Sequence, residues 1–253
     1  MTSKVTKQSV ALLTDGCKQV PRFFCAVPLH VGLTTALPSD TCRHIQVLRM
    51  QPGDTVTLFD GLGGEYSACI LQMGRQTVQA RVDAHHAIER ESPVISHVVM
   101  GMPANERMDW LVEKATELGV ARITPLMTSH GVLRLTGDRA LKRQLHWQAI
   151  AQSACAQSGR NRLPIIDKPQ HWSEWLDALP VDETQQRWVL SLCVDAKPCT
   201  VAQTRVMLLS GPEGGLSREE EAQAMTKGFL PLRLGSRVLR AETAPIAMLS
   251  HWL

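Results

Sequence analysis

Short runs of alternating apolar and polar residues, separated by turn-forming residues, fill the first third of the chain. Four such runs, RFFCAV, DTVTLF, EYSACIL and TVQARV, occur between Arg22 and about Val82. The segments between them include Pro52-Gly53-Asp54 and a glycine-rich stretch at residues 60–64, and both favour turns. We therefore expect a small β-barrel, closed by a short helix in HIQVLRM and followed by the polar linker HHAIERESP.

From Val94 onward, strand-like apolar segments alternate with longer amphipathic ones. The segment VISHVVMGM is followed by the helix-like ERMDWLVEKATELG, the strand-like ARITPLM and a helical pattern over residues 138–158. Apolar residues recur at helical spacing from Met108 to Leu118, and Gly119 favours the end of that helix. Three further strand-like segments follow, RWVLSLCV, TRVMLLS and FLPLRL. This alternation predicts a parallel sheet covered by helices, so the expected fold class is α+β with two domains, a β-barrel followed by an α/β domain.

The composition is typical of a globular chain. Of its 253 residues, 44% are hydrophobic and 20% are charged, which is enough apolar material for one large or two smaller domains. No apolar run approaches the roughly 20 residues of a membrane-spanning helix, and residues 1–20 lack the apolar core of a signal peptide. We expect a cytoplasmic protein that has no membrane partner.

The seven cysteines and nine histidines are dispersed along the chain. The cysteines form no Cys-x-x-Cys pair and have no histidine at zinc-binding spacing, so we expect reduced thiols, most of them in the core. His85 and His86 are adjacent, but neighbours in a strand point to opposite faces of the sheet. We therefore expect no metal site.

Positive charge is concentrated in the middle of the chain. Residues 122–168 contain eight Lys or Arg against two Asp, which leaves a local charge of +6 in a chain of net charge +3. Arg139, Lys142 and Arg143 lie in the long helical pattern of this segment. Two interpretations are open for these three cations, a solvated helix face or a surface that binds phosphates.

A glycine-rich loop follows the strand-like segment VMLLS. The sequence LLSGPEGGLSREEEA delivers Gly211-Pro212-Glu213-Gly214-Gly215 to the carboxyl edge of the predicted sheet, where open parallel sheets bind ligands. The glycines permit close approach of the backbone to a flat ligand, although a tight strand-to-helix turn is the alternative. Walker and dinucleotide-binding patterns are absent, and Glu213 suits a neutral or cationic ligand better than a polyphosphate. Ser217 and Glu220 predict a capping box for the next helix.

A second loop carries charged residues into an apolar helix. The sequence LRLGSRVLRAETAPIAML contains Arg237 and Arg240, followed by Glu242 and Thr243. Together with SGPEGGLSREE, KATELGVARITPL and AQSGRNRLP, this segment resembles the bacterial ribosomal RNA small subunit methyltransferase E family, which belongs to the SPOUT class. The N-terminal PRFFCAVPL and HIQVLRMQPGDTVTLFDGLGGEY are also similar to that family, so the resemblance extends from about Pro21 to the end.

The resemblance implies a domain organisation and an activity. It implies a PUA-like β-barrel that helps to hold RNA at residues 21–88 and a SPOUT methyltransferase domain with a C-terminal trefoil knot at residues 93–253. Residues 1–20 fall outside it and form an N-terminal extension or result from an early start codon. The implied activity is S-adenosyl-L-methionine-dependent methylation of N3 of one uridine in 16S ribosomal RNA, by a homodimer that acts on the RNA or on the assembled 30S subunit.

The same resemblance assigns site residues. The cofactor is expected to contact the ends of three strands and the loops that follow them, namely Leu190, Ser191, Leu192, Leu209, Ser210, Gly211, Pro212, Glu213, Gly214, Gly215, Leu234, Gly235, Arg237, Val238, Leu239 and Thr243. Such contacts need backbone groups in an apolar slot and no charged anchor. RNA is expected to contact a set of cations, namely Arg22, Arg139, Lys142, Arg143, Arg160 and Arg162.

Arg240 and Glu242 are the expected catalytic residues. Methyl transfer to a uracil nitrogen requires the nitrogen to lose its proton, and the guanidinium of Arg240 beside the uracil oxygens would stabilise the resulting negative charge. The alternative for Arg240 is a structural ion pair with Glu242. Glu242, near a helix N-terminus, is expected to remain a carboxylate and to orient its partner rather than act as a base. The sequence assigns no general base.

The chain departs from the family pattern at two places. The family usually has Glu-Arg-Ser after the strand that ends near Pro-Leu, where this chain has Ser129-His130-Gly131, and a Glu where this chain has Ala156. We interpret these changes as the coordinated replacement of one polar cluster. The replacement either changes the hydrogen bonds of a structural network or alters the placement of the substrate. Two other functions stay open: a SPOUT methyltransferase for another site, such as a ribose 2′-hydroxyl, and a non-catalytic RNA-binding assembly factor.

The C-terminal segment TAPIAMLSHWL is too apolar for a free chain end. Ile246, Leu249 and Trp252 fall at helical spacing. We expect this helix to contribute apolar contacts to a homodimer, with docking on its own domain as the alternative.

Overall fold

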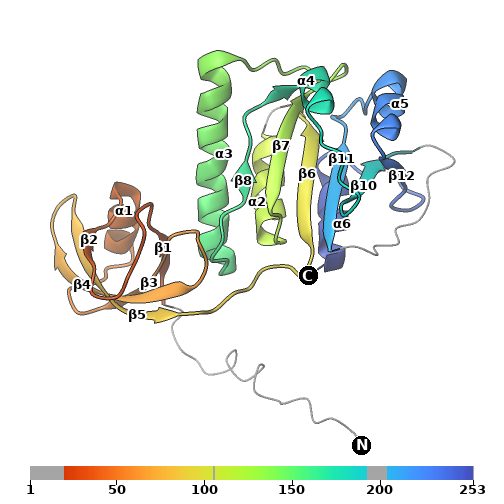
Figure 1. Ribbon diagram of the computed structural model, residues 1–253. Helices are drawn as coiled ribbons and strands as arrows, with labels where there is room; N and C mark the ends of the chain where they lie inside the picture. Colours follow the sequence, from red (N-terminus) through yellow and green to blue (C-terminus); the bar gives the residue numbers. More distant parts are fainter. Residues whose placement is uncertain (1–19, 105, 193–203, 253) are drawn as a thin grey trace, which may run out of the picture.

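A computed structural model describes residues 20–104, 106–192 and 204–252. The chain forms a small β-rich part followed by a larger α/β part, and an extended segment after residue 86 joins them (Figure 1). The predicted extension at residues 1–20 lies outside the described residues, apart from Val20. The two-part α+β architecture expected from the sequence is confirmed.

The β-rich part is one five-stranded sheet with a helix. Its elements are β1 (Arg22–Phe24), β2 (Thr34–Ala36), α1 (Ser39–Val47), β3 (Thr55–Phe59), β4 (Glu65–Met73) and β5 (Val78–His86). The strand order is β1-β3-β4-β5-β2, and every pair is antiparallel except β1 with β3. Burial alternates along β5, where Val78, Ala80 and Val82 face the core, because successive side chains of a strand point to opposite faces.

Two details of this part differ from the sequence expectation. The helix predicted in HIQVLRM begins earlier, directly after Pro38, and ends at Val47. It ends because Arg49 adopts a left-handed backbone conformation, with φ of 57°, which a helix cannot contain. The short edge strand β2 was not predicted, since TTA is too brief to show an alternating pattern.

The α/β part is a parallel sheet covered on both faces. Its elements are β6 (Ile95–Gly101), α2 (Arg107–Glu117), β7 (Arg122–Met127), α3 (Gly137–Ser158), β8 (Ile165–Ile166), β9 (Gln170–His171), α4 (Trp172–Asp177), β10 (Gln186–Leu190), β11 (Arg205–Ser210), α5 (Arg218–Thr226), β12 (Leu230–Leu232), α6 (Thr243–Leu249) and the 3₁₀ helix η1 (Ser250–Trp252). The strand order is β12-β10-β11-β6-β7-β8, with β9 also paired to β7, and every pair is parallel.

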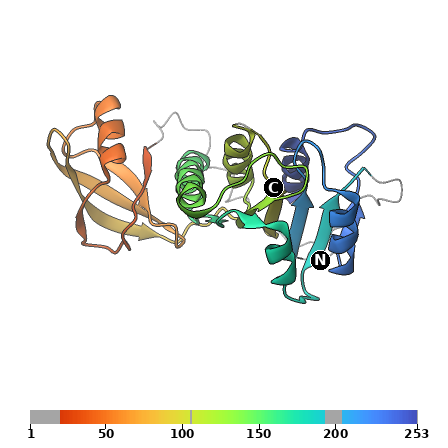
Figure 2. The ribbon, with the colours of Figure 1, turned by 90° about the horizontal axis from the view of Figure 1, so that it is seen from above.

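Two apolar clusters hold the helices to this sheet. One cluster joins α2, α3 and α6 to one face through residues such as Leu111, Trp147 and Met248. The other joins α4 and α5 to the opposite face through residues such as Trp175 of α4, Ala224 of α5 and Phe229, which follows α5. Figure 2 shows the same division, with α2, α3 and α6 on one side of the sheet and α4 and α5 on the other. This layering leaves the carboxyl ends of the strands for loops.

A network of arginines joins the β-rich part, which we call the barrel, to the α/β part. Arg160 is only 3% exposed; it pairs with Glu91, and its Nη1 donates to the carbonyl oxygens of Thr116 at 2.8 Å and Val120 at 3.1 Å. Arg22 pairs with Glu65 of the barrel and donates to Asn161 Oδ1 of the α/β part at 2.7 Å. The sequence predicted that both arginines bind RNA. Arg160 contradicts that prediction, because its buried guanidinium group is bonded to Glu91 and two carbonyl groups and cannot reach a phosphate. Arg22 is only partly buried, and its Nε has no hydrogen-bond partner among the described residues.

Arg162 lies in the same region but on its surface. Its Nη2 is 3.2 Å from Glu89 Oε1, and its side chain is 54% exposed. Arg160 and Arg162 therefore form a matched pair, one arginine buried and one exposed, within three residues of the chain.

Arg160→Ala should lower the free energy of unfolding by about 3 kcal/mol, because it leaves Glu91 and two carbonyl groups without their partner in a largely buried place. Arg162→Ala should cost less than about 1 kcal/mol, as for exposed ion pairs. Urea unfolding measures both values. Equal effects of the two substitutions would contradict the role assigned to Arg160.

Candidate functional site

A cavity of about 310 Å³ lies where β10, β11 and β12 end. We call it the loop cavity, because the loops after these three strands form its walls. These strands are neighbours in the sheet, so parallel pairing brings their carboxyl ends to one edge. The register aligns Leu190 with Leu232, and Ser191 N donates to the Leu232 carbonyl at 3.0 Å just beyond the pairing.

Most residues predicted to bind the cofactor line the loop cavity. They are Leu190, Ser191, Leu192, Ser210, Gly211, Pro212, Glu213, Gly215, Leu234, Gly235, Arg237, Val238 and Leu239. Three predicted residues do not line it. Leu209 is fully buried in the core beneath it, Gly214 faces His130, and Thr243 lines a neighbouring cavity.

The structure adds lining residues that the sequence did not indicate. They are Leu216, Glu221, Leu232, Arg233, Ala241 and Ala244. Leu216, Arg233, Ala241 and Ala244 are adjacent in sequence to predicted site residues, and Leu232 ends β12, so a wider window around each predicted loop would have included all five. Glu221 is different, because its place depends on how the first turn of α5 lies against the loops.

The glycine loop packs tightly against itself. A Cβ atom on Gly211 would lie 2.5 Å from the backbone of Gly215 and Leu216, so no side chain fits there. Gly215 adopts φ of 69° and donates its N–H to the Pro212 carbonyl at 2.8 Å, which closes a turn. The predicted capping box is confirmed, since Ser217 Oγ accepts from Glu220 N and Glu220 Oε2 accepts from Ser217 N. At Gly211 and Gly215, the turn itself accounts for the absence of a side chain.

Glu213 is neutralised by groups outside the loop. Its Oε1 accepts from Ala104 N at 3.0 Å and from Arg107 Nη1 at 2.9 Å. The Nε of Arg107 is also 3.9 Å from Glu242 Oε1. Arg107 therefore lies between two carboxylates, one from each of the loops that flank the loop cavity.

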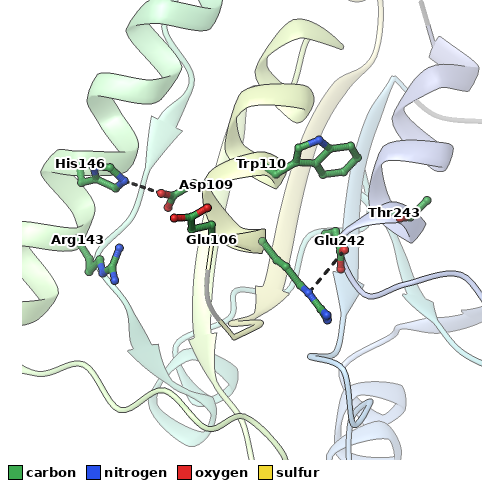
Figure 3. Close-up of a pocket in the computed structure, with 8 residues that line it drawn as sticks. Glu106, Asp109, Trp110, Arg143, His146, Glu242 and Thr243 are labelled. Atoms are coloured by element: carbon green, nitrogen blue, oxygen red, sulfur yellow. Dashed lines mark hydrogen bonds and ion pairs between the residues drawn. The ribbon is translucent and has the colours of Figure 1, made fainter.

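A second, more open cavity of about 720 Å³ adjoins this arginine. We call it the helix cavity, because α2, α3 and the start of α6 surround it; its lining residues are Glu106, Arg107, Asp109, Trp110, Arg143, His146, Glu242 and Thr243. Figure 3 shows these side chains converging from the three helices, with His146 hydrogen-bonded to Asp109. Arg107 and Glu242 line this cavity, and their partner Glu213 lines the loop cavity, so the two cavities share a wall.

Arg240 is exposed and lines neither cavity, but its neighbours in sequence do: Leu239 and Ala241 line the loop cavity and Glu242 lines the helix cavity. Its carbonyl oxygen accepts from Thr243 N at 2.9 Å and Ala244 N at 3.1 Å, which fixes its backbone at the start of α6. Among the described residues, its guanidinium group forms no ion pair. Glu242 is 8% exposed and pairs with Arg107, so the alternative of an Arg240–Glu242 ion pair is not what the structure contains.

The departures from the family pattern lie in two separate places. Ser129 donates through N and Oγ to Glu220 Oε1 in the first turn of α5, and His130 Nδ1 is 3.0 Å from the Gly214 carbonyl oxygen in the loop before it. Ala156 lies near the other end of α3, in a cavity against the barrel. The prediction that these residues replace one polar cluster is therefore wrong.

The apolar C-terminal helix packs on its own domain. Met248, Leu249 and Trp252 are buried against α2 and the sheet, and the Trp252 carbonyl accepts from Ser92 Oγ at 3.0 Å. These contacts account for the apolar character that suggested a dimer interface. Trp110 on α2, beside the start of α6 in Figure 3, remains 41% exposed.

Arg139, Lys142 and Arg143 are exposed along one stretch of α3. None of the three forms an ion pair within residues 20–104, 106–192 and 204–252. Arg143 also lines the helix cavity, so this cationic surface reaches the edge of the candidate site.

Other chemistry is sparse in the described part of the chain. Cys25, Cys42 and Cys155 are buried free thiols, and burial raises the pKa of Cys25 and Cys155 to about 11, so neither is a nucleophile. Cys17, Cys193 and Cys199 lie outside the described residues. The described residues contain no cluster of three or more His, Cys, Asp or Glu suited to a metal ion. They also contain no helix with the length and apolarity needed to cross a membrane.

Comparisons with known proteins agree with this architecture. The family model described as RNA methyltransferase domain matches residues 90–253, and the model described as RNA methyltransferase PUA domain matches residues 37–83. A ribosomal RNA small subunit methyltransferase E from Buchnera aphidicola is 30% identical over 92% of this chain and 95% of its own length. The protein of the same name from Bacillus subtilis is 26% identical over 86% of this chain and 88% of its own.

A solved structure gives the same result. The ribosomal RNA small subunit methyltransferase E of Neisseria gonorrhoeae, bound to S-adenosyl methionine, is 34% identical and superposes with a TM-score of 0.84. The alignment covers 92% of this chain and 96% of that one. Both domains, the order of their elements and most of the chain length thus agree with one group of enzymes. The chain belongs to the ribosomal RNA small subunit methyltransferase E family.

Proposed function

We propose that this chain uses S-adenosylmethionine to methylate N3 of a uridine in 16S ribosomal RNA. The observation that carries the proposal is the convergence of residues 190–192, 210–215 and 234–239 on one cavity at the carboxyl edge of the sheet. The relative from Neisseria gonorrhoeae that binds this cofactor shares the fold over nearly its whole length.

The lining of the loop cavity suits this cofactor. Its volume of about 310 Å³ lies at the lower end of the range for small-molecule sites. Leu190, Leu192 and Leu239 offer apolar walls for an adenine ring, and the loop backbone offers hydrogen-bonding groups. Acidic and basic side chains, including Glu221 and Arg233, line the same cavity and match a ligand that carries both signs of charge. When bound, the cofactor would supply a methyl group activated by its sulfonium.

Arg240 is the proposed catalytic residue. The uracil N3 becomes nucleophilic only when its proton is lost, and the negative charge then spreads to the neighbouring carbonyl oxygens. An arginine with a fixed backbone and no competing carboxylate can donate to those oxygens and stabilise that charge. Glu242 would help to hold Arg107 near the start of α6 by charge alone, since its Oε1 is 3.9 Å from Arg107 Nε and its buried Oε2 has no hydrogen-bond partner among the described residues.

Methyl transfer to small ribosomal subunits and to free 16S RNA, followed by nucleoside analysis, tests the activity. The wild-type protein should yield 3-methyluridine. Arg240→Ala should lower the single-turnover rate by about 100-fold, the scale for loss of one preorganised donor, while cofactor affinity stays within a few fold. Arg218→Ala, which removes an exposed arginine of α5 that lines neither cavity, is the matched control.

Several outcomes would contradict this proposal. A methylated ribose would indicate a different target atom, and the absence of both cofactor binding and transfer would favour an RNA-binding assembly factor. An unchanged rate for Arg240→Ala would exclude the role proposed for its guanidinium group. Comparison of the two substrates shows whether free RNA or the 30S subunit is preferred.

The RNA would lie along the barrel and the exposed cations of α3. Arg139, Lys142 and Arg143 have no carboxylate partners among the described residues and lead to the helix cavity. Arg162 would contribute from the junction of the two parts, because its side chain is half exposed. This arrangement would hold RNA beside the loop cavity without contacts to the cofactor.

Replacement of Arg139, Lys142 and Arg143 by alanine should weaken RNA binding without changing cofactor affinity. The slope of log K against log salt should fall by up to about 2, because each lost phosphate contact with single-stranded RNA contributes about 0.7. Filter binding at several salt concentrations measures this slope. An unaltered slope would leave these cations as an ordinary solvated helix face.

We also propose that the protein is a cytoplasmic homodimer with domains at residues 21–88 and 93–253, and that its C-terminal segment forms a trefoil knot. The path of the chain supports the knot. After β12, at one edge of the sheet, the chain turns back, and α6 packs against α2 and β11 in the middle of the domain. Support for the dimer is Trp110, which is exposed beside α6.

Sedimentation equilibrium should give twice the chain mass at tens of micromolar protein. Trp110→Glu should shift the protein toward the monomer, because it places a charge in an apolar interface. Val181→Glu, at an exposed apolar residue far from α2 in sequence, should not. A monomeric wild type at these concentrations would exclude the dimer.

A further inference from the structure

We propose that His130 is a positioning residue that holds the glycine loop, Gly211–Gly215, from outside the loop cavity, and that His130 excludes a side chain at Gly214. The inference rests on the proposed function, because the loop is assigned to the cofactor there. It concerns a position where this chain departs from the usual pattern of its family.

The contact between His130 and the loop is a hydrogen bond of defined direction. His130 Nδ1 is 3.0 Å from the Gly214 carbonyl oxygen and 3.3 Å from the Gly215 carbonyl oxygen. Both carbonyls can only accept, so Nδ1 must carry the proton. The imidazole therefore fixes the orientation of two consecutive peptide groups at the point where the loop turns toward α5.

Gly214 is constrained by packing and not by its backbone conformation. Its φ lies outside the left-handed region that favours glycine, so an alanine could adopt the same backbone. A Cβ atom at Gly214, however, would lie 2.9 Å from the Cβ of His130. That Cβ belongs to the rigid base of a side chain and cannot swing aside. Gly214 does not line the loop cavity, so contact with a ligand in that cavity does not explain why this position lacks a side chain.

His130 can act as an anchor because its own segment is fixed. Ser129 donates to Glu220 Oε1 from N at 2.8 Å and from Oγ at 3.1 Å. Arg134 donates to the carbonyl oxygens of Gly131 at 2.6 Å and Thr128 at 3.2 Å. The turn after β7 is therefore held on both sides of His130, and through Glu220 it is tied to the start of α5.

The loop is thus held at both flanks. On one side, Glu213 binds Ala104 N and Arg107, and on the other side, His130 binds the carbonyls of Gly214 and Gly215. A ligand that uses backbone groups of this loop needs those groups already oriented, since ordering them upon binding would reduce affinity. His130 should consequently affect cofactor affinity without touching the cofactor.

The first test compares substitutions that remove or retain the donor. Titration calorimetry with S-adenosylmethionine should show about tenfold weaker binding for His130→Ala, the scale for one lost hydrogen bond. His130→Asn should stay within about threefold of the wild type, because the amide nitrogen of Asn reaches a position similar to Nδ1. His171→Ala, which removes the exposed histidine at the end of β9, should have no effect.

The second test measures coupling between positions 130 and 214. Gly214→Ala should weaken cofactor binding by about tenfold in the wild type, as overpacking requires the loop to shift. In a His130→Gly background, which removes the obstructing Cβ, the same substitution should cost less than about twofold. Urea unfolding of the four proteins without cofactor should show the same non-additivity.

The outcomes separate this inference from the proposed function. A wild type that does not bind S-adenosylmethionine contradicts the proposed function, while the unfolding cycle still tests the contact between His130 and Gly214. Additive effects in that cycle would overturn the packing argument. If the wild type binds but His130→Ala binds equally well, or if His130→Asn is as weak as His130→Ala, the positioning role is excluded.

Discussion

The parallel pairing of β12, β10 and β11 is the constraint on which the candidate site depends. Because parallel strands end at the same edge, three loops that are distant in sequence must meet beyond Leu190, Ser210 and Leu232. The loops contribute little regular structure of their own. Their shape comes from the sheet register below them and from side chains of α2 and the β7–α3 turn beside them.

The arginines and lysines of this protein fall into two groups, those held by partners inside the protein and those exposed to solvent, and the net charge does not distinguish them. Arg160 is buried and Arg22 half-buried where the barrel meets the α/β part, and carboxylate, carbonyl and amide oxygens accept hydrogen bonds from both. The cations of α3 remain exposed and without partners among the described residues. The basic segment therefore contains both a buried arginine at the junction of the two parts and a row of exposed cations on α3, the surface proposed for RNA. The first group sets the geometry in which the second can act.

Arg107 connects the two cavities of the candidate site. It pairs with Glu213 in the wall of the loop cavity and lies beside Glu242 at the start of α6, so it balances two carboxylates that would otherwise repel each other. Arg240 therefore has no ion pair among the described residues, and the same holds for Arg237 in the same loop. Arg107 thus neutralises Glu213 in the wall of the loop cavity, whereas Glu221, Arg233 and Arg237 line the same cavity without an ion pair among the described residues, which suits a ligand that carries charges of both signs.

The sequence by itself determined the element types and the capping box at Ser217, because periodicity and capping are local properties. It also predicted the edge at which the loops gather, because strands that alternate with helices pair in parallel and end on one side of the sheet. It also indicated most of the loop cavity's lining. The tertiary structure alone decided which arginines are buried, why Gly214 has no side chain, and that Thr243 faces the helix cavity. Each of these depends on a partner distant in sequence, such as Glu91 for Arg160 or His130 for Gly214. Residue type and spacing define what a side chain can bind, and only packing defines what lies within its reach.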